Sequence, residues 1–263
     1  MKEYKNSLLN LLCKRYPSLT REELTVLILT GKAYVNSHKE RNPKVLLLKT
    51  SKINLVISES RRFVSRGGNK LFEALETFKI TVRDKICVDV GASTGGFTDC
   101  LLQEGAKLVY SIDVGFNQIS YRLRIDSRVR VFEKTNIFDI KQFDIPPNLA
   151  VIDVSFRSAV SICANLIDKL VDKFIIVLIK PQFELKGLDL NIKGFSGVVE
   201  NKYLSQILDK VIRKFYDSNL QVKNILKLKT KGRKGNQELM FWVVKDSLVN
   251  LEQSLALLRD INF

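Results

Sequence analysis

Four charged residues in this chain stand where apolar runs begin or end, and such positions suit chemistry. Asp113, Asp153 and Lys180 each follow an apolar run, and Glu238 comes directly before one. A charge buried there without a partner costs several kcal/mol, so the lysine and the acids need one another or a ligand. For any single one of them, a solvated strand end is the alternative.

A glycine-rich turn accompanies these charges. Residues 86–90 form a short β-branched run, and the turn that follows opens into an amphipathic segment, residues 98–103. This pattern predicts a strand, a tight loop and a helix N-terminus, whose free N–H groups face an electronegative group. An ordinary tight connection is the alternative. The spacing Asp-x-Gly-x-x-x-Gly is similar to the S-adenosylmethionine loop of class I methyltransferases. The candidate cofactor residues of this loop are Asp89, Gly91, Ala92, Ser93, Thr94, Gly95, Gly96 and Phe97.

Apolar runs alternate with helical segments throughout the rest of the chain. The predicted strands are residues 86–90, 108–113, 129–132, 149–154, 174–180, 222–228 and 239–244. Such alternation predicts an α/β fold, a mostly parallel sheet with helices on both faces and ligands at the carboxyl ends of its strands. In class I methyltransferases an acid after the second strand holds the ribose hydroxyls, which points to Asp113 and Val114 here. Asn136 and Ile137, after the third strand, are the candidates for adenine contacts.

The first quarter of the chain is basic. The net charge is +15, and residues 1–66 carry 14 basic against 5 acidic residues. A basic module suggests an anionic polymer as partner, most simply nucleic acid, although a lysine-rich solvated surface is the alternative. Periodicity predicts helices at residues 4–14 and 20–29, followed by short strands. The elements Thr20-Arg21 and Gly31-Lys32-Ala33-Tyr34-Val35-Asn36 resemble an S4-type RNA-binding domain.

These features predict three segments: an α+β S4-type domain at residues 1–60, a linker at 61–68 and a class I methyltransferase domain with a Rossmann-like sheet at 69–263. A second basic run, residues 227–236, lies just before Glu238 and would bring positive charge to a phosphate backbone beside the site. The candidate RNA-binding residues are Arg15, Arg21, Lys32, Arg66, Lys231, Arg233 and Lys234.

The composition argues against several other classes of protein. Four cysteines are scattered without Cys-x-x-Cys spacing, and His38 is the only histidine, so neither a zinc site nor histidine acid–base chemistry is expected. No apolar run approaches the roughly 18 residues of a membrane span. No signal-peptide pattern follows Met1, and a cytoplasmic location is therefore expected.

Taken together, the motifs resemble the TlyA family, long labelled haemolysins but regarded as ribosomal RNA 2′-O-methyltransferases that fuse an S4-type domain to an FtsJ-like domain. The matching stretches include residues 64–71, 89–99, 113–115, 123–129, 135–137, 153–156, 180–184 and 235–238. The resemblance implies S-adenosylmethionine as cofactor, ribosomal RNA or a ribosomal subunit as partner, and cytidine as target. It places the family's Lys-Asp-Lys-Glu catalytic set on Lys70, Asp153, Lys180 and Glu238.

This set has a physical explanation. A ribose 2′-hydroxyl is a very weak acid, so its attack on a methyl group needs a base or a cation that stabilises the developing alkoxide. A lysine serves as base only in its neutral form, which burial near other cations favours. We expect Lys180 to be the base or alkoxide stabiliser and Lys70 to orient the same hydroxyl. Asp153 and Glu238 would hold the two ammonium groups, and no metal is required.

Two other functions are compatible with parts of the sequence. One is a non-catalytic RNA-binding or ribosome-assembly protein that binds S-adenosylmethionine, against which the intact catalytic set argues. The other is a membrane-active haemolysin, against which the absence of a signal peptide and of an apolar span argues.

Overall fold

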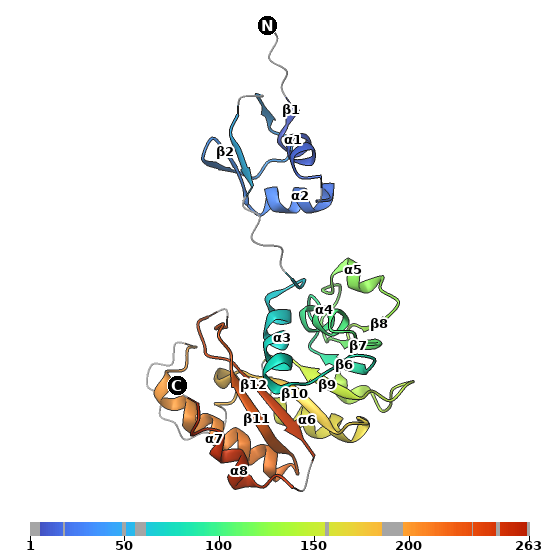
Figure 1. The fold of residues 1–263 in the computed structure, drawn as a ribbon, viewed down its shortest axis with the longest axis vertical. Helices are drawn as coiled ribbons and strands as arrows, with labels where there is room; N and C mark the ends of the chain where they lie inside the picture. Colours follow the sequence, from blue (N-terminus) through green and yellow to red (C-terminus); the bar gives the residue numbers. More distant parts are fainter. Residues whose placement is uncertain are drawn as a thin grey trace. The chain divides into compact units, whose positions relative to one another are not determined.

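Alternating apolar runs build one seven-stranded sheet in the C-terminal part of the chain (Figure 1). The computed structural model describes residues 6–17, 19–48, 51–55, 62–155, 158–185, 197–232, 234–245 and 248–261. The chain divides into two compact units, residues 1–61 and 62–263.

The sheet of the second unit has the strand order β11-β12-β10-β9-β6-β7-β8. Its strands are β6 (Ile86–Val90), β7 (Leu108–Ile112), β8 (Val129–Phe132), β9 (Leu149–Ile152), β10 (Phe174–Ile179), β11 (Gln221–Lys227) and β12 (Leu239–Val244). The pairs among β6, β7, β8, β9 and β10 are parallel, and β12 runs antiparallel to both β10 and β11. The predicted strands and the α/β fold class are confirmed, with ends that differ by one or two residues.

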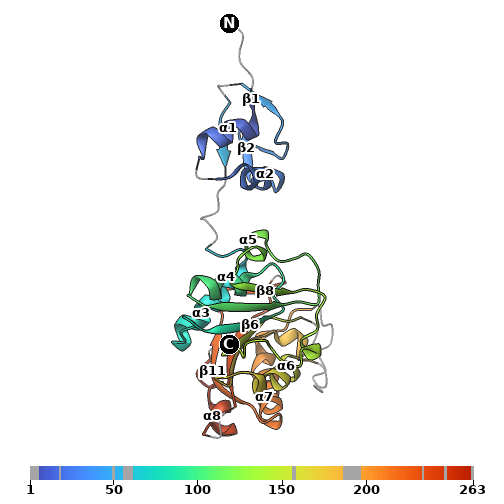
Figure 2. The ribbon, with the colours of Figure 1, turned by 90° about the vertical axis from the view of Figure 1, so that its right-hand side faces the viewer.

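Both faces of this sheet are covered by helices. The helices are α3 (Arg66–Phe78), α4 (Gly96–Gln103), α5 (Tyr121–Arg124), α6 (Ala159–Leu166), α7 (Asn201–Asp217) and α8 (Leu251–Ala256), with 3-10 turns η1 (Ile137–Asp139), η2 (Ile167–Lys169) and η3 (Pro181–Phe183). Alternate residues of each strand enter different cores, because successive side chains point to opposite faces. Val88 packs in the core beneath α6 and α7, whereas Cys87 packs in the core beneath α3 and α4. Figure 2 shows α6, α7 and α8 together on one side of the sheet.

The structure differs from the sequence prediction at the linker. Of the predicted linker 61–68, residues 62–68 belong to the second unit, and α3 already begins at Arg66. Phe63 is buried, and the absence of a side chain on Gly68 lets its backbone lie against that ring. A Cβ on Gly68 would come within 2.4 Å of Phe63, so the glycine is required for this close approach.

The first unit is a small α+β structure. It contains β1 (Asn6–Ser7), α1 (Leu8–Arg15), α2 (Arg21–Leu29), β2 (Ala33–Val35), β3 (His38–Glu40), β4 (Leu46–Leu47) and β5 (Ile53–Leu55). A three-stranded sheet of order β3-β2-β5 and the pair β1-β4 surround a small core of leucine and isoleucine. The helix predicted at residues 20–29 begins with a capping box between Thr20 and Glu23. Within the described parts of both units, no helix has the length and apolar character to cross a membrane.

Candidate active site

The loop between β6 and α4 presents its backbone rather than side chains. Gly91, Ser93 and Gly95 all have positive φ angles, of 83°, 48° and 90°. The N–H groups of Gly91 and Ala92 both donate to the carbonyl of Ile112, at 2.8 and 3.2 Å, which ties the loop to β7. A Cβ on Gly91 would lie 2.3 Å from the carbonyl oxygen of Asp153. Only glycine therefore fits between the two strand ends.

Asp113 lies beside this loop at the end of β7. One of its carboxylate oxygens accepts from the backbone N–H of Ser93 at 2.7 Å, and the other from Gly115 at 2.6 Å. These bonds fix the carboxylate while leaving lone pairs on both oxygens for hydroxyl donors. Val114, the next residue, is largely exposed. Asp113 therefore lies beside the glycine-rich loop at the end of β7, and its contact with ribose hydroxyls stays a prediction.

The remaining candidate cofactor residues fall into two groups. Thr94, like Ser93, is exposed at the turn, and Asn136 caps η1 by accepting from the N–H of Phe138 at 3.2 Å. By contrast, Ala92, Gly95, Gly96, Phe97 and Ile137 are buried. Phe97 and Ile137 pack in the two hydrophobic cores, so their side chains hold the loops in place.

Asp89 is a fully buried carboxylate at the end of β6. One oxygen accepts from both the backbone N–H and the hydroxyl of Thr98, at 2.8 and 2.7 Å, and so fastens the first turn of α4 to the strand. The other oxygen has no hydrogen-bond partner among the described residues. Burial raises the pKa of Asp89 from 3.8 to about 7, and the nearby charges of Asp153 and Asp113 add to this rise.

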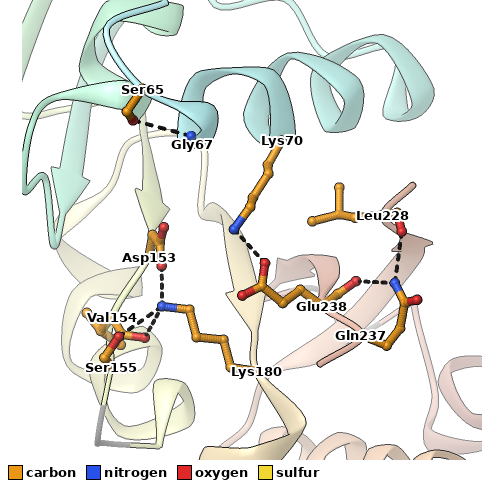
Figure 3. A network of polar contacts seen from close by, with 10 residues as sticks. All are labelled: Ser65, Gly67, Lys70, Asp153, Val154, Ser155, Lys180, Leu228, Gln237 and Glu238. Carbon is orange, nitrogen blue, oxygen red and sulfur yellow. Dashed lines mark hydrogen bonds and ion pairs between the residues drawn. The ribbon is translucent and has the colours of Figure 1, made fainter. Parts of the chain in front are cut away.

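Two lysine–carboxylate pairs lie at the same edge of the sheet (Figure 3). Lys70, from the second turn of α3, contacts a carboxylate oxygen of Glu238 at 2.5 Å, and their side chains are 14% and 6% exposed. Glu238 stands directly before β12, where Gln237 donates to the carbonyl of Leu228 at 2.8 Å and fixes the start of the strand. Among the described residues, Glu238 is the only hydrogen-bond partner of the Lys70 ammonium group.

The second pair joins Lys180 to Asp153. The Lys180 Nζ lies 2.6 Å from the Asp153 carboxylate and donates at 3.0 Å to both the Val154 carbonyl and the Ser155 hydroxyl. Two hydrogen bonds and one ion pair suit an ammonium ion. All three partners belong to the loop that connects β9 to α6.

The sheet order brings the two pairs together. β10 lies between β9 and β12, so its end at Lys180 has Asp153 on one side and Glu238 on the other. Ile179 pairs directly with Leu239, and the residues that follow and precede them are Lys180 and Glu238. Because Gly91 touches the backbone of Asp153, the four charged residues and the glycine-rich loop share one edge of the sheet.

The candidate RNA-binding residues are spread over both units. In the first unit, Arg15 donates to the carbonyl of Ile53 at 2.7 Å, and Arg21 donates to Asn10 at 3.1 Å. Arg15 therefore braces its own unit, whereas Lys32 is exposed. In the second unit the exposed candidates are Arg66, Lys231 and Lys234. Arg233 lies outside the described residues.

Three residues of this site had no role assigned from the sequence. Asp99 accepts from the backbone N–H of Val64 at 2.7 Å and forms an ion pair with Arg122, which fastens the segment before α3 to α4. Ser155 and Glu184 hold the β9–α6 loop. For the two acids, the sequence does show a signal, because an acid within or next to an apolar run needs a partner once it is buried. The sequence does not show which residue that partner is.

Comparison with known proteins fits this arrangement. The FtsJ-like methyltransferase family matches residues 63–245. The chain belongs to this family. It is 40% identical to hemolysin A of Brachyspira hyodysenteriae, over 84% of this chain and 92% of that protein. It is 34% identical to the 16S/23S rRNA (cytidine-2′-O)-methyltransferase TlyA of Mycobacterium tuberculosis, over 88% and 87% of the two chains. The solved structure of a hemolysin-named protein from Streptococcus thermophilus is 34% identical, with a TM-score of 0.67 over 97% of this chain and 96% of that one.

S-adenosylmethionine is the methyl donor of this FtsJ-like methyltransferase, and the residues present fit it. The loop at Gly91 and Gly95 offers bare backbone, and Asp113 offers carboxylate oxygens for hydroxyl groups. The Asp89 oxygen that has no partner among the described residues is a hydrogen-bond acceptor available to the ammonium and hydroxyl groups of that cofactor. When bound, the cofactor supplies an electrophilic methyl group.

The buried carboxylate of Asp89 makes stability depend on pH. The unfolded chain releases this proton near pH 4, whereas the folded protein holds it up to about pH 7. Stability from this group is therefore full below pH 4 and is lost as the pH rises to about 7. We expect Asp89→Asn, which still accepts from Thr98, to melt above the wild type at pH 8 and close to it at pH 4. Thermal melts without cofactor measure the difference in melting temperature between variant and wild type at each pH. If that difference were smaller at pH 8 than at pH 4, burial would not be the cause of the raised pKa.

Proposed function

We propose that this chain transfers a methyl group from S-adenosylmethionine to a ribose 2′-hydroxyl of ribosomal RNA, with cytidine as the target. The observation that carries the proposal is the meeting of two lysine–carboxylate pairs beside the glycine-rich loop. The printed activity of the Mycobacterium tuberculosis relative, at 34% identity, supports the choice of substrate. Ribosomal RNA also implies action in the cytoplasm, on free RNA or on a ribosomal subunit.

The roles of the two lysines follow from their partners. Lys70 has one described acceptor, so its remaining N–H groups can donate to the hydroxyl oxygen and orient it. Lys180 donates two hydrogen bonds and has the Asp153 carboxylate as its counter-ion, which keeps it charged and supports a role as the cation that stabilises negative charge on that oxygen as its proton leaves. Asp153 and Glu238 hold the ammonium groups in place. Methyl transfer is an in-line displacement, so alignment supplies much of the acceleration.

The product identifies the reaction. Ribosomal RNA incubated with tritiated S-adenosylmethionine and the protein should gain label that resists alkaline hydrolysis and that nucleoside digestion recovers as 2′-O-methylcytidine. A 2′-O-methyl group blocks the hydroxyl needed for alkaline cleavage, so a base methyl would behave differently. Label on a base, or no label on free RNA or on either ribosomal subunit, would refute the proposal.

The first unit would serve as the RNA anchor. We propose that it is an S4-type domain, supported by its basic composition and by its α+β arrangement of two helices and a small sheet. Because phosphate contacts release counterions, deleting residues 1–61 should weaken RNA binding and flatten its salt dependence. Fluorescence anisotropy at several salt concentrations measures both quantities. Cofactor affinity, measured by calorimetry, should not change, and unaltered RNA affinity would argue against an anchoring role.

A further inference from the structure

The three partners of the Lys180 ammonium group all lie in one short loop. Asp153, Val154 and Ser155 lead from β9 toward α6, and Figure 3 shows them gathered around the Lys180 ammonium group. The same loop touches the cofactor turn, because Gly91 lies against the backbone of Asp153. The position of this loop therefore sets both the lysine and its distance from the cofactor turn.

A buried acid holds the far end of the loop. Glu184 is 3% exposed, and one of its carboxylate oxygens accepts from the backbone N–H of Ala159, the first residue of α6, at 3.3 Å. Ser158 occupies the N-cap position but makes no side-chain cap bond. Glu184, which lies 25 residues further along the chain, therefore caps the N-terminus of α6 in place of Ser158.

Glu184 is also tied rigidly to Lys180. The 3-10 turn η3 separates them, with Pro181 at its first position. The N–H of Phe183 donates to the Lys180 carbonyl at 2.9 Å, and the N–H of Glu184 donates to the Pro181 carbonyl at 3.1 Å. The Lys180 side chain therefore binds the start of the connection, at residues 153–155, Glu184 binds the first residue of α6, and η3 joins Lys180 to Glu184.

We propose that Glu184 is a positioning residue for methyl transfer, which acts by fixing the β9–α6 loop and through it the Lys180 ammonium group. The inference rests on the proposed function of the site. The reach of its side chain to the N–H of Ala159 is what matters, rather than its charge. The second carboxylate oxygen of Glu184 has no hydrogen-bond partner among the described residues. Replacing that oxygen by the amide nitrogen of glutamine therefore breaks no hydrogen bond.

Three variants separate reach from charge. Glu184→Gln keeps the reach without the charge, Glu184→Asp keeps the charge with a shorter reach, and Glu184→Ala removes both. We expect kcat to fall roughly ten- to hundredfold in the Asp and Ala variants and to stay within about threefold of wild type in the Gln variant. The Kd for S-adenosylmethionine, from calorimetry, should change by less than about threefold in all three.

A control and a second readout keep the test decisive. Asn148→Ala removes a comparable acceptor, which binds the N–H of Ile86 at 3.0 Å at the opposite edge of the sheet, and should leave kcat unchanged. Amide hydrogen exchange at Ala159 should accelerate in the Asp variant and not in the Gln variant, whatever the activity. Two outcomes would overturn the positioning role, provided that the wild type is active. One is a wild-type kcat in all three Glu184 variants, and the other is a low kcat in the Gln variant with a wild-type kcat in the Asp variant. An inactive wild type would instead refute the proposed function.

Discussion

Replacing Lys180 by alanine should lower the rate of methyl transfer by roughly 10²- to 10⁴-fold, the range expected for loss of a group that manages a proton or its charge. Lys180 lies 2.6 Å from Asp153 and at the edge of the sheet where the two ion pairs meet. Its ammonium group contacts no residue of the glycine-rich loop among the described contacts, so cofactor binding should survive. Tritium incorporation under single-turnover conditions measures the rate, and calorimetry measures the binding.

The control for Lys180→Ala is another lysine in an ion pair. Lys85 contacts Asp172 at 2.5 Å at the opposite edge of the sheet, and its side chain is partly exposed. Lys85→Ala should have the wild-type rate, which would show that the loss depends on the site rather than on any broken ion pair. Parallel loss of cofactor affinity and rate in Lys180→Ala would make Lys180 a cofactor or folding residue instead.

Replacing Gly91 by alanine should abolish cofactor binding. The new Cβ would lie 2.3 Å from the Asp153 carbonyl oxygen. In addition, residues other than glycine rarely adopt the φ of 83° found at this position. Because a misplacement of about 1 Å at a reacting centre can lower the rate about 100-fold, we expect at least that loss of rate, and no binding heat in calorimetry. The displaced backbone belongs to Asp153, so the ion pair with Lys180 should be disturbed as well.

A matched glycine separates the clash from the backbone strain. Gly105 has a similar φ of 93°, but a Cβ there would meet its nearest atoms at 3.4 Å or more. Gly105→Ala should therefore carry only the strain of a left-handed conformation, about 1–2 kcal/mol, and should bind the cofactor like the wild type. If Gly91→Ala bound within about fivefold of wild type, the close approach of the two strand ends would not matter for the cofactor.

The sheet was predictable because its signals are local. Each apolar run, such as residues 174–179, is long enough to identify a buried strand. The charged residues at the strand ends were predictable for the same reason, since the strand boundaries place them. Asp113, Asp153 and Lys180 all lie at the edge where the parallel sheet predicts them.

Features that depend on distant contacts were not predictable. Residues 62–68 read as a polar linker, yet Phe63 is buried because Gly68 allows close contact with its ring and Asp99 binds the N–H of Val64. The capping of α6 by Glu184 joins residues 25 apart, and no local pattern encodes it. In both cases the sequence shows a residue that needs a partner without showing which partner it finds.

Lys70 and Lys180 should act as one unit on a single hydroxyl group. The most direct test is a double-mutant cycle, in which single-turnover methyl transfer to ribosomal RNA is compared among Lys70→Ala, Lys180→Ala and the double variant. Groups that act together give strongly non-additive losses, so the double variant should be no more than a few-fold slower than the slower single variant. Losses that multiply in the double variant would contradict the claim, because they would mean that the two ammonium groups act independently.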